Sequence, residues 1–315
     1  MEVRSHPLTL ERGWVALPSS YAMPEHAPTL AEAQVYCERL ARSHYENFSV
    51  ATWLLPARLK QHFFNVYAYC RISDDLGDEV GDPQQSLALL DQWEAELNQC
   101  YDGAPRHPVF VALQRSVRAL DIPRKPFADL LVAFRQDQTV SRYETFDDLL
   151  GYCLNSANPV GRLVLYVCGY RDSERQRLSD FTCTALQLAN FWQDVAVDYG
   201  KGRIYLPLED LRRFGVTEQQ IANHQTTSAF VELMKFEVAR AREWFARGLP
   251  LASMVDPSLA IDIELFTRGG QEILNAIERQ GHDVLKRRPV ISKSRKLGLL
   301  VRAAVSRAFR GGRTR

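Results

Sequence analysis

The stretch YCRISDDLGDE, residues 69–79, places four carboxylates and one arginine at the end of an apolar segment, FFNVYAYC, residues 63–70. On a helix, the polar side chains of this region follow one another at steps of three or four residues and form one stripe. The stripe consists of Tyr67, Arg71, Asp74 or Asp75, and Asp78. A helix that is apolar nearly all round is normally buried, and buried carboxylates are costly unless they are paired or bind a cation. The stretch therefore predicts a buried helix beside a polar cavity, a metal ion, or both.

A second stretch, TALQLANFWQDVAVDYGKGRIYLP, residues 184–207, repeats the pattern. Its polar stripe runs through Gln187, Asn190, Asp194 and Asp198. Carboxylate and amide oxygens at this spacing suit Mg²⁺, a hard cation that takes oxygen ligands. Either stretch alone is equally well explained by acids on a solvated helix face. Two stripes, each inside an apolar helix, favour Mg²⁺ bound around a diphosphate.

The rest of the chain also carries helical patterns. They cover residues 30–46 after a Thr29 cap, 84–101, 107–120, 126–138, 144–169, 173–199, 227–247 and 257–280. No regular alternation predicts a sheet. We therefore expect an all-α, single-domain helical bundle with a central cavity. The expected boundaries are a loose N-terminal segment over 1–25, a helical domain over 26–295 and a basic amphipathic tail over 296–315.

Composition limits the cellular setting. The six cysteines form no C-x-x-C pair, which argues against a zinc or redox motif and suits a reducing compartment. The N-terminus has no apolar region typical of a secretory signal, and no apolar run approaches the roughly 20 residues of a membrane span. These features predict a cytoplasmic protein.

The net charge of +1 conceals a basic C-terminal region. Residues 286–315 contain eleven lysines and arginines and no acid. On a helix, residues 296–315 would present an apolar strip flanked by arginines, which suits peripheral contact with an anionic membrane at its inner face. A solvated flexible tail and a packed C-terminal helix remain alternatives. We expect no nucleic-acid partner, because the rest of the chain is acidic and contains no known nucleic-acid-binding module.

Several motifs in order along the chain resemble the squalene/phytoene synthases, the head-to-head branch of the class I isoprenoid synthases. The resemblance covers about residues 30–295. The first motifs are HYENF, which begins at His44, and YAYCR, which begins at Tyr67 and leads to DDLGDE at residues 74–79. They are followed by Tyr152-Cys153 and Val160-Gly161, then by QLAN at residues 187–190 with Asp194 and Asp198 after it. The last is GRIYLP, which begins at Gly202. Both their spacing and their order fit the family.

This resemblance implies roles for individual residues toward a prenyl diphosphate substrate. The Mg²⁺ ligands would be Asp74, Asp78, Asn190, Asp194 and Asp198. The residues expected to bind the diphosphate or the first prenyl carbons are His44, Asn47, Gln187, Arg203 and, less securely matched, Arg268. The residues expected to act in catalysis are Tyr67, Arg71, Tyr152 and Asn158.

Two departures from the family suggest a subgroup. Many relatives carry arginine where this chain has Gln193, and Val-Ala-Gly where it has Ser-Ala-Asn-Pro at 156–159. A proline inside a helix removes one hydrogen bond and bends the axis, so Asn158 would hold a water in the cavity wall. A simple helix kink is the alternative. The stretches HYENF, SANPVGRLVLYVCGY and QLANFWQDV look most like the bacterial hydroxysqualene synthases of hopanoid biosynthesis.

The expected reaction is therefore Mg²⁺-dependent conversion of presqualene diphosphate and water to hydroxysqualene and diphosphate. The nearest alternative is another head-to-head reaction, namely synthesis of presqualene diphosphate, of phytoene, or of squalene with NADPH. Gly200 and Gly202 form no dinucleotide fingerprint, because Tyr205 replaces the third glycine and no strand precedes them. An alternative of another class is a non-catalytic assembly factor of the same fold. The complete ligand set argues against it, because a scaffold needs none of these residues.

Overall fold

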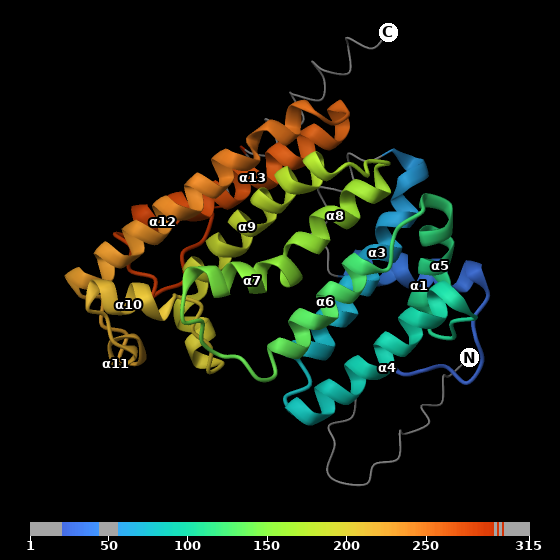
Figure 1. Cartoon of the computed structure of the whole chain (residues 1–315), viewed down its shortest axis with the longest axis horizontal. Helices are drawn as coiled ribbons and strands as arrows, with labels where there is room; N and C mark the ends of the chain where they lie inside the picture. Colours follow the sequence, from blue (N-terminus) through green and yellow to red (C-terminus); the bar gives the residue numbers. More distant parts are fainter. Residues whose placement is uncertain (1–20, 44–55, 293–294, 296–297, 299–315) are drawn as a thin grey trace. The chain divides into compact units, whose positions relative to one another are not determined.

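The computed structural model describes residues 21–43, 56–292, 295 and 298, and no strand occurs among them. This confirms the predicted all-α class. The helices group into two compact units (Figure 1). Unit 1 comprises residues 1–139 with 163–170, and unit 2 comprises residues 140–162 with 171–315. Each unit is described by itself.

Unit 1 is built around the helix that carries the first acidic stretch. Its helices are α1 Leu30–Ser43, α3 Ala57–Asp78, α4 Pro83–Asp102, α5 Pro108–Leu120 and α6 Lys125–Gln136. Helix α3 packs against each of the other four. The apolar run before the acids explains this position, because every residue from Phe63 to Tyr69 is buried. Sequence analysis therefore identified the central helix of this unit.

Hydrogen bonds from buried polar groups fix α3 among its neighbours. The Tyr69 hydroxyl donates to the Phe127 carbonyl at 2.8 Å, and the Trp93 indole N–H donates to the Ser73 hydroxyl at 2.9 Å. Such bonds satisfy groups that would otherwise be costly to bury. They hold the α3 backbone at a fixed rotation, so that its polar stripe has a defined direction.

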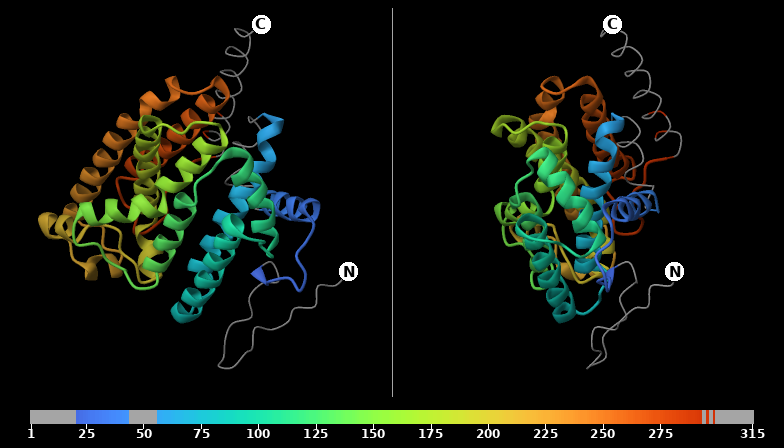
Figure 2. Two further views of the ribbon diagram at one scale, coloured as in Figure 1. Left: turned by 45° about the vertical axis from the view of Figure 1, so that its right-hand side comes forward. Right: turned by 90° about the vertical axis from the view of Figure 1, so that its right-hand side faces the viewer.

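Unit 2 is built around the second acidic helix in the same way. Its elements are α7 Phe146–Ser156, the start of α8 Asn158–Val167, α9 Ser173–Gly200, α10 Leu208–Phe214, α11 Glu218–Ala222, α12 Ser228–Gly248, the 3-10 helix η2 Leu249–Ser253 and α13 Pro257–Arg279. Helix α9 packs against α7, α11, α12, α13 and η2. Helices α12 and α13 make extensive contacts with α9, and Figure 2 shows the helices from two further sides.

Two glycines allow this close packing around α9. A Cβ atom on Gly161 would lie 2.3 Å from the Ser179 hydroxyl, and one on Gly270 would lie 2.4 Å from the Phe245 ring and 2.8 Å from Leu186. Real side chains do not approach that closely. Any larger residue at these two positions would push α8 or α13 away from its neighbours.

The structure differs from the predicted helices in two respects. The region 144–169 is two helices, α7 and α8, separated at Ala157, where φ is −111° and ψ is −47°. The bend expected from Pro159 is therefore a complete break, because the proline supplies no backbone donor in the first turn of α8. The short helices α10 and α11 were not predicted. For the first predicted helix, residues 30–43 are helical and residues 44–46 lie outside the described part.

No helix among the described residues is both long and apolar enough to cross a membrane.

Candidate functional site

The first stripe lies on the last turns of α3, and its arginine is held by an aspartate of the same helix. We call Tyr67, Arg71, Asp74, Asp75 and Asp78 the α3 stripe. The Arg71 Nε donates to Asp75 Oδ2 at 3.2 Å, and its Nη2 forms a shorter ion pair with Asp75 Oδ1. Asp74 Oδ2 lies 3.7 Å from Arg71 Nη1. The guanidinium therefore binds mainly to Asp75, whose side chain is 2% exposed.

The other acids of the α3 stripe repel one another. Burial, followed by the like charge of Asp78, raises the pKa of Asp74 to about 6, although 50% of its side chain is exposed. Burial lowers the pKa of Arg71, but the charges of Asp75 and Asp74 outweigh it and the pKa is raised overall. Burial also raises the pKa of Tyr67. A cation beside Asp74 and Asp78 would relieve this repulsion.

The second stripe lies near the end of α9. We call Gln187, Asn190, Asp194 and Asp198 the α9 stripe. The Asn190 amide donates to Asp194 Oδ2 at 2.7 Å, so these two predicted ligands lie together. Arg203 follows the helix, and its backbone N–H donates to the Asp198 carbonyl at 2.9 Å. The α9 stripe thus keeps the order and spacing that the sequence predicted.

An arginine that the sequence analysis counted only as part of the basic C-terminal region completes the α9 stripe. Arg288 donates from Nη2 to Asp194 Oδ2 at 2.9 Å, and its Nε binds Asp194 Oδ1. Its hydrogen bonds to Asp194, reinforced by the charge of Asp198, raise the pKa of Arg288. Fork-shaped contacts of this kind are the strong form of an arginine–carboxylate pair. The sequence signal, two adjacent arginines before a proline, was too short to identify this role.

Gln193 holds the segment that carries Arg288. Its Nε2 donates to the Pro289 carbonyl at 2.6 Å, and its Oε1 accepts from Arg288 Nη2 at 3.3 Å. The amide at position 193 therefore binds both the guanidinium of Arg288 and the backbone of Pro289. The positive charge beside Asp194 comes from a different part of the chain.

Polar groups gather at the break between α7 and α8. Asn158 is 2% exposed, and its Oδ1 accepts from the Thr184 hydroxyl of α9 at 2.9 Å. The Ser156 hydroxyl oxygen is buried, and no hydrogen-bond partner for it lies among the described residues. Unsatisfied buried hydroxyls are uncommon and often bind an ordered water. The break thus combines a fixed amide with a hydroxyl that can still accept or donate.

Tyr152, one helical turn before Ser156, belongs to an aromatic cluster. The cluster consists of Tyr143, Tyr152, Phe191 and Tyr205. Phe191 and Tyr205 stack with ring centroids 3.9 Å apart, and Tyr152 lies 6.2 Å from Phe191 and 5.9 Å from Tyr205. These rings are buried and offer π faces that stabilise cations.

The remaining predicted residues are not joined to either stripe by a described contact. Arg268 lies on α13, 3.9 Å from Glu264, in a groove of about 510 Å³ between α13 and η2. None of the other predicted site residues lines that groove. His44 and Asn47 lie outside the described residues.

The donor atoms of both stripes fit magnesium in kind. Each stripe offers carboxylates one helical turn apart, and the α9 stripe adds the Asn190 amide, all oxygen donors of the type that Mg²⁺ prefers. Within each unit, the described residues contain no cluster of three or more His, Cys, Asp or Glu side chains arranged to hold a metal ion. A Mg²⁺ ion at either stripe would need waters or substrate oxygens to complete its coordination.

Comparison with known proteins gives consistent matches. The squalene/phytoene synthase family model matches residues 41–295. The chain is 31% identical to the 15-cis-phytoene synthase of Synechococcus elongatus, over 88% of this chain and 94% of that protein. It is similar to the crystal structure of squalene synthase HpnC from Alicyclobacillus acidocaldarius, with 46% identity, a TM-score of 0.77, and coverage of 80% of this chain and 95% of that one. A dehydrosqualene synthase solved with a ligand gives 28% identity and a TM-score of 0.80, covering 88% and 96% of the two chains.

Proposed function

Since the chain belongs to the squalene/phytoene synthase family, we propose that it converts presqualene diphosphate and water to hydroxysqualene and diphosphate with Mg²⁺. The chain is an isoprenoid synthase of the prenyltransferase type with the predicted class I fold. The finer assignment is the proposal. It draws support from the higher identity to the squalene synthase HpnC, 46%, than to the phytoene synthase of Synechococcus, 31%.

The observation that carries the proposal is the polar break between α7 and α8. A prenyl cation that meets only apolar and aromatic side chains has no oxygen nucleophile. The Ser156 hydroxyl and the Asn158 amide can hold a water, because both can donate and accept hydrogen bonds. Thr184 fixes Asn158 from α9, so this amide has one orientation.

Each stripe offers groups that can act on a leaving diphosphate. When bound, Mg²⁺ neutralises the charge that develops on the departing diphosphate. Arg71 and Arg288 add fixed positive charge, each oriented by a carboxylate of its own unit. The buried aromatic cluster around Tyr152 stabilises the carbocation and excludes other water.

Isotope labelling tests this function directly. Purified protein is supplied with presqualene diphosphate and Mg²⁺ in ¹⁸O-labelled water, with and without NADPH. We expect an alcohol about two mass units heavier than in ordinary water, whether or not NADPH is present. Squalene that forms only with NADPH would instead identify a reductive enzyme.

Two variants test the polar break. Ser156→Ala and Asn158→Ala should shift the product from alcohol toward elimination products, because each removes a hydrogen-bonding group for the water. Ser253→Ala is the matched control, since that hydroxyl lies in the same unit and donates only to the Pro250 carbonyl. An unchanged product profile in both variants would remove these residues from the mechanism.

Condensation of two prenyl diphosphates is the second candidate function. Curated relatives named phytoene synthase match over most of their length at about 30% identity. Farnesyl and geranylgeranyl diphosphate should therefore be assayed beside presqualene diphosphate. Rapid formation of phytoene or presqualene diphosphate would favour the condensation reaction.

For the setting, we propose a cytoplasmic enzyme that binds the inner face of the membrane peripherally through its C-terminal tail. The tail over residues 296–315 lies outside the described residues, apart from Gly298. Its arginines suit anionic lipids, and the expected product is an oil-soluble molecule.

A further inference from the structure

Asp75 is the buried acid of the α3 stripe that received no predicted role. It lies between the predicted ligands Asp74 and Asp78 in sequence, but it faces Arg71 and is only 3% exposed. A buried carboxylate is costly unless it is paired or hydrogen-bonded. Both of its oxygens do contact cationic or hydroxyl donors.

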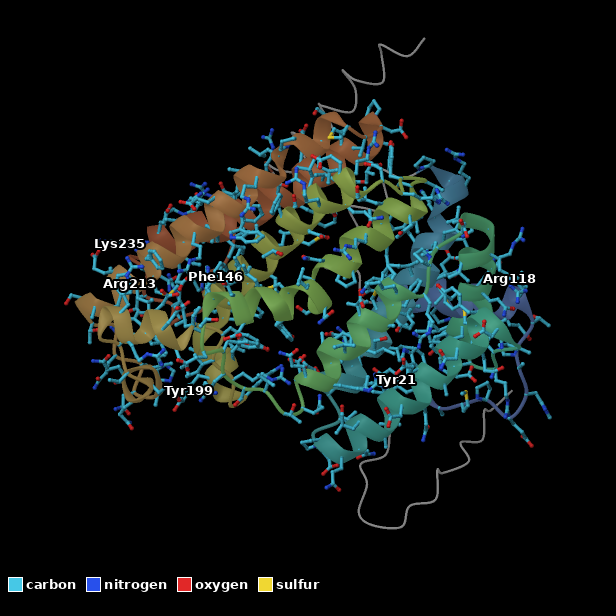
Figure 3. The ribbon with its side chains drawn as sticks, viewed as in Figure 1. Tyr21, Arg118, Phe146, Tyr199, Arg213 and Lys235 are labelled. Carbon is cyan, nitrogen blue, oxygen red and sulfur yellow. The ribbon has the colours of Figure 1, made fainter. Side chains whose placement is uncertain are left out.

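One of those donors comes from a distant segment. The Tyr21 hydroxyl, labelled in Figure 3, donates to Asp75 Oδ2. Asp75 Oδ2 therefore accepts from both Tyr21 and the Arg71 Nε, and Oδ1 pairs with Arg71 Nη2. Tyr21, Asp75 and Arg71 form a continuous hydrogen-bonded array within unit 1, which we call the Tyr21 array.

The segment that carries Tyr21 is held to the unit by a second anchor. Arg106 donates from Nη2 to the Pro24 carbonyl at 3.1 Å and to the Glu25 carbonyl at 2.9 Å. Residues 21–25 belong to the segment that was expected to be loose. They are attached to the unit by the Tyr21 side chain and by the backbone carbonyls of residues 24 and 25. Together, the two anchors restrict the conformations open to the tyrosine.

We propose that Asp75 and Tyr21 are positioning residues that hold the Arg71 guanidinium in the orientation that binds the substrate diphosphate, an inference that rests on the proposed function. Asp75 takes the Nε and Nη2 edge of the guanidinium. Nη1, only 3.7 Å from Asp74, stays on the side of the predicted metal ligands. Tyr21 fixes Asp75 in turn, so the N-terminal segment contributes to the site through two hydrogen-bonded steps.

An arginine side chain that is already held in its binding orientation contributes more to the affinity for an anion than a mobile one. A long side chain loses rotamer freedom when it binds an anion, and a preformed ion pair removes that cost before the substrate arrives. The array therefore acts on the affinity for diphosphate and on the stabilisation of the departing charge.

The test measures binding of inorganic diphosphate with Mg²⁺ to the full-length chain by titration calorimetry. Tyr21→Phe should weaken binding about tenfold, the scale of one hydrogen bond to a charged group. Asp75→Asn should weaken it by at least as much. Tyr101→Phe is the matched control, because its hydroxyl donates to the Ile122 carbonyl of the same unit, away from the array.

A double-mutant cycle separates positioning from an independent role. If Asp75 acts through Arg71, the Arg71→Ala and Asp75→Asn/Arg71→Ala variants should bind diphosphate within about twofold of each other. If the losses of diphosphate affinity in Asp75→Asn and Arg71→Ala multiply in the double variant, the proposal is overturned. Wild-type affinity in both Tyr21→Phe and Asp75→Asn would overturn it as well. Circular dichroism checks the fold, and Tyr21→Phe, which keeps the ring, provides the milder variant.

These results are separable from the proposed function. Diphosphate binding that depends on the array would stand even if labelling in ¹⁸O water identified a different prenyl product. Conversely, the protein could form the alcohol while its affinity for diphosphate does not depend on Tyr21 and Asp75. That result would support the proposed function and reject the positioning role of the Tyr21 array.

Discussion

The two stripes differ in where their arginine comes from and in which aspartate it binds. On α3, Arg71 lies one turn before its partner Asp75, which is not a predicted metal ligand. On α9, Arg288 comes from 94 residues further along the chain and binds Asp194, which is a predicted ligand. The main partner of Arg71 lies outside the predicted ligand set, although its Nη1 also lies 3.7 Å from Asp74, whereas Arg288 occupies a carboxylate that a cation would also need. A Mg²⁺ ion at the α9 stripe would therefore compete with Arg288 for Asp194, whereas at the α3 stripe the main partner of the arginine is not a predicted ligand.

The largest expected effect comes from removing one ligand of either stripe. Asp78→Asn and Asp194→Asn should each lower turnover by at least about a thousandfold, because the leaving diphosphate loses charge neutralisation. Circular dichroism should remain that of the wild type. Near-normal turnover in the presence of EDTA would contradict the metal role of both stripes.

The arginine of the α9 stripe gives the most direct test of the comparison. Arg288→Ala should lower turnover by about 10- to 100-fold, the range of one charge-assisted contact to the departing group. Because Asp194 is then released, half-maximal activity should need less Mg²⁺. Arg71→Ala should lower turnover without this gain, since Arg71 binds Asp75.

A neighbouring arginine controls for loss of charge. The Arg287 side chain contacts Gln280 only weakly, at 3.4 Å, and Arg287→Ala should leave both the turnover and the Mg²⁺ requirement near wild type. An unchanged Mg²⁺ requirement in Arg288→Ala would show that the guanidinium and the cation do not compete.

Truncation of the tail should have a smaller effect, and it distinguishes the role of Arg288 from that of the basic residues that follow it. Truncation after Gly298 retains Arg288 and removes five arginines at 302, 307, 310, 313 and 315. Binding to anionic vesicles at ~0.1 M salt should fall by at least about tenfold, while turnover in detergent stays within about twofold. Equal vesicle binding with and without the tail would reject the membrane role.

The smallest expected effect concerns the anchor of the Tyr21 segment. Arg106→Ala should weaken diphosphate binding by about two- to threefold, because Tyr21 keeps its own bond to Asp75 but loses the nearby backbone attachment. Arg106 touches neither Asp75 nor Arg71, so any effect must pass through the segment. A larger loss than in Tyr21→Phe would indicate a general defect of unit 1 instead.

The features that could be predicted from the sequence are those that depend on residues close together in the chain. The α3 and α9 stripes could be predicted because residues three or four apart share a helix face whatever surrounds them. The break before α8 was foreseeable in kind from Pro159. Helix α11 also had a signal, the Thr217 and Gln220 capping box, but at five residues it is too short to show a periodic pattern.

Contacts between distant segments could not be predicted from one sequence. The pairs Arg288–Asp194 and Tyr21–Asp75 join residues whose separation bears no relation to helical period. From the sequence alone, many other arginines and tyrosines could equally well have been the partners of these two aspartates. Only the packing of each unit selects one of them.

The distance along the chain between α9 and Arg288 also sets when their contact can form during synthesis. Synthesis proceeds from the N-terminus, so the α9 helix leaves the ribosome well before Arg288 is translated. During that interval Asp194 has no guanidinium beside it, and Gln193 has no Pro289 carbonyl to bind. A chain cut short by premature termination before this residue never gains the contact. The order of translation therefore keeps the α9 site incomplete until residues 288 and 289 have been made.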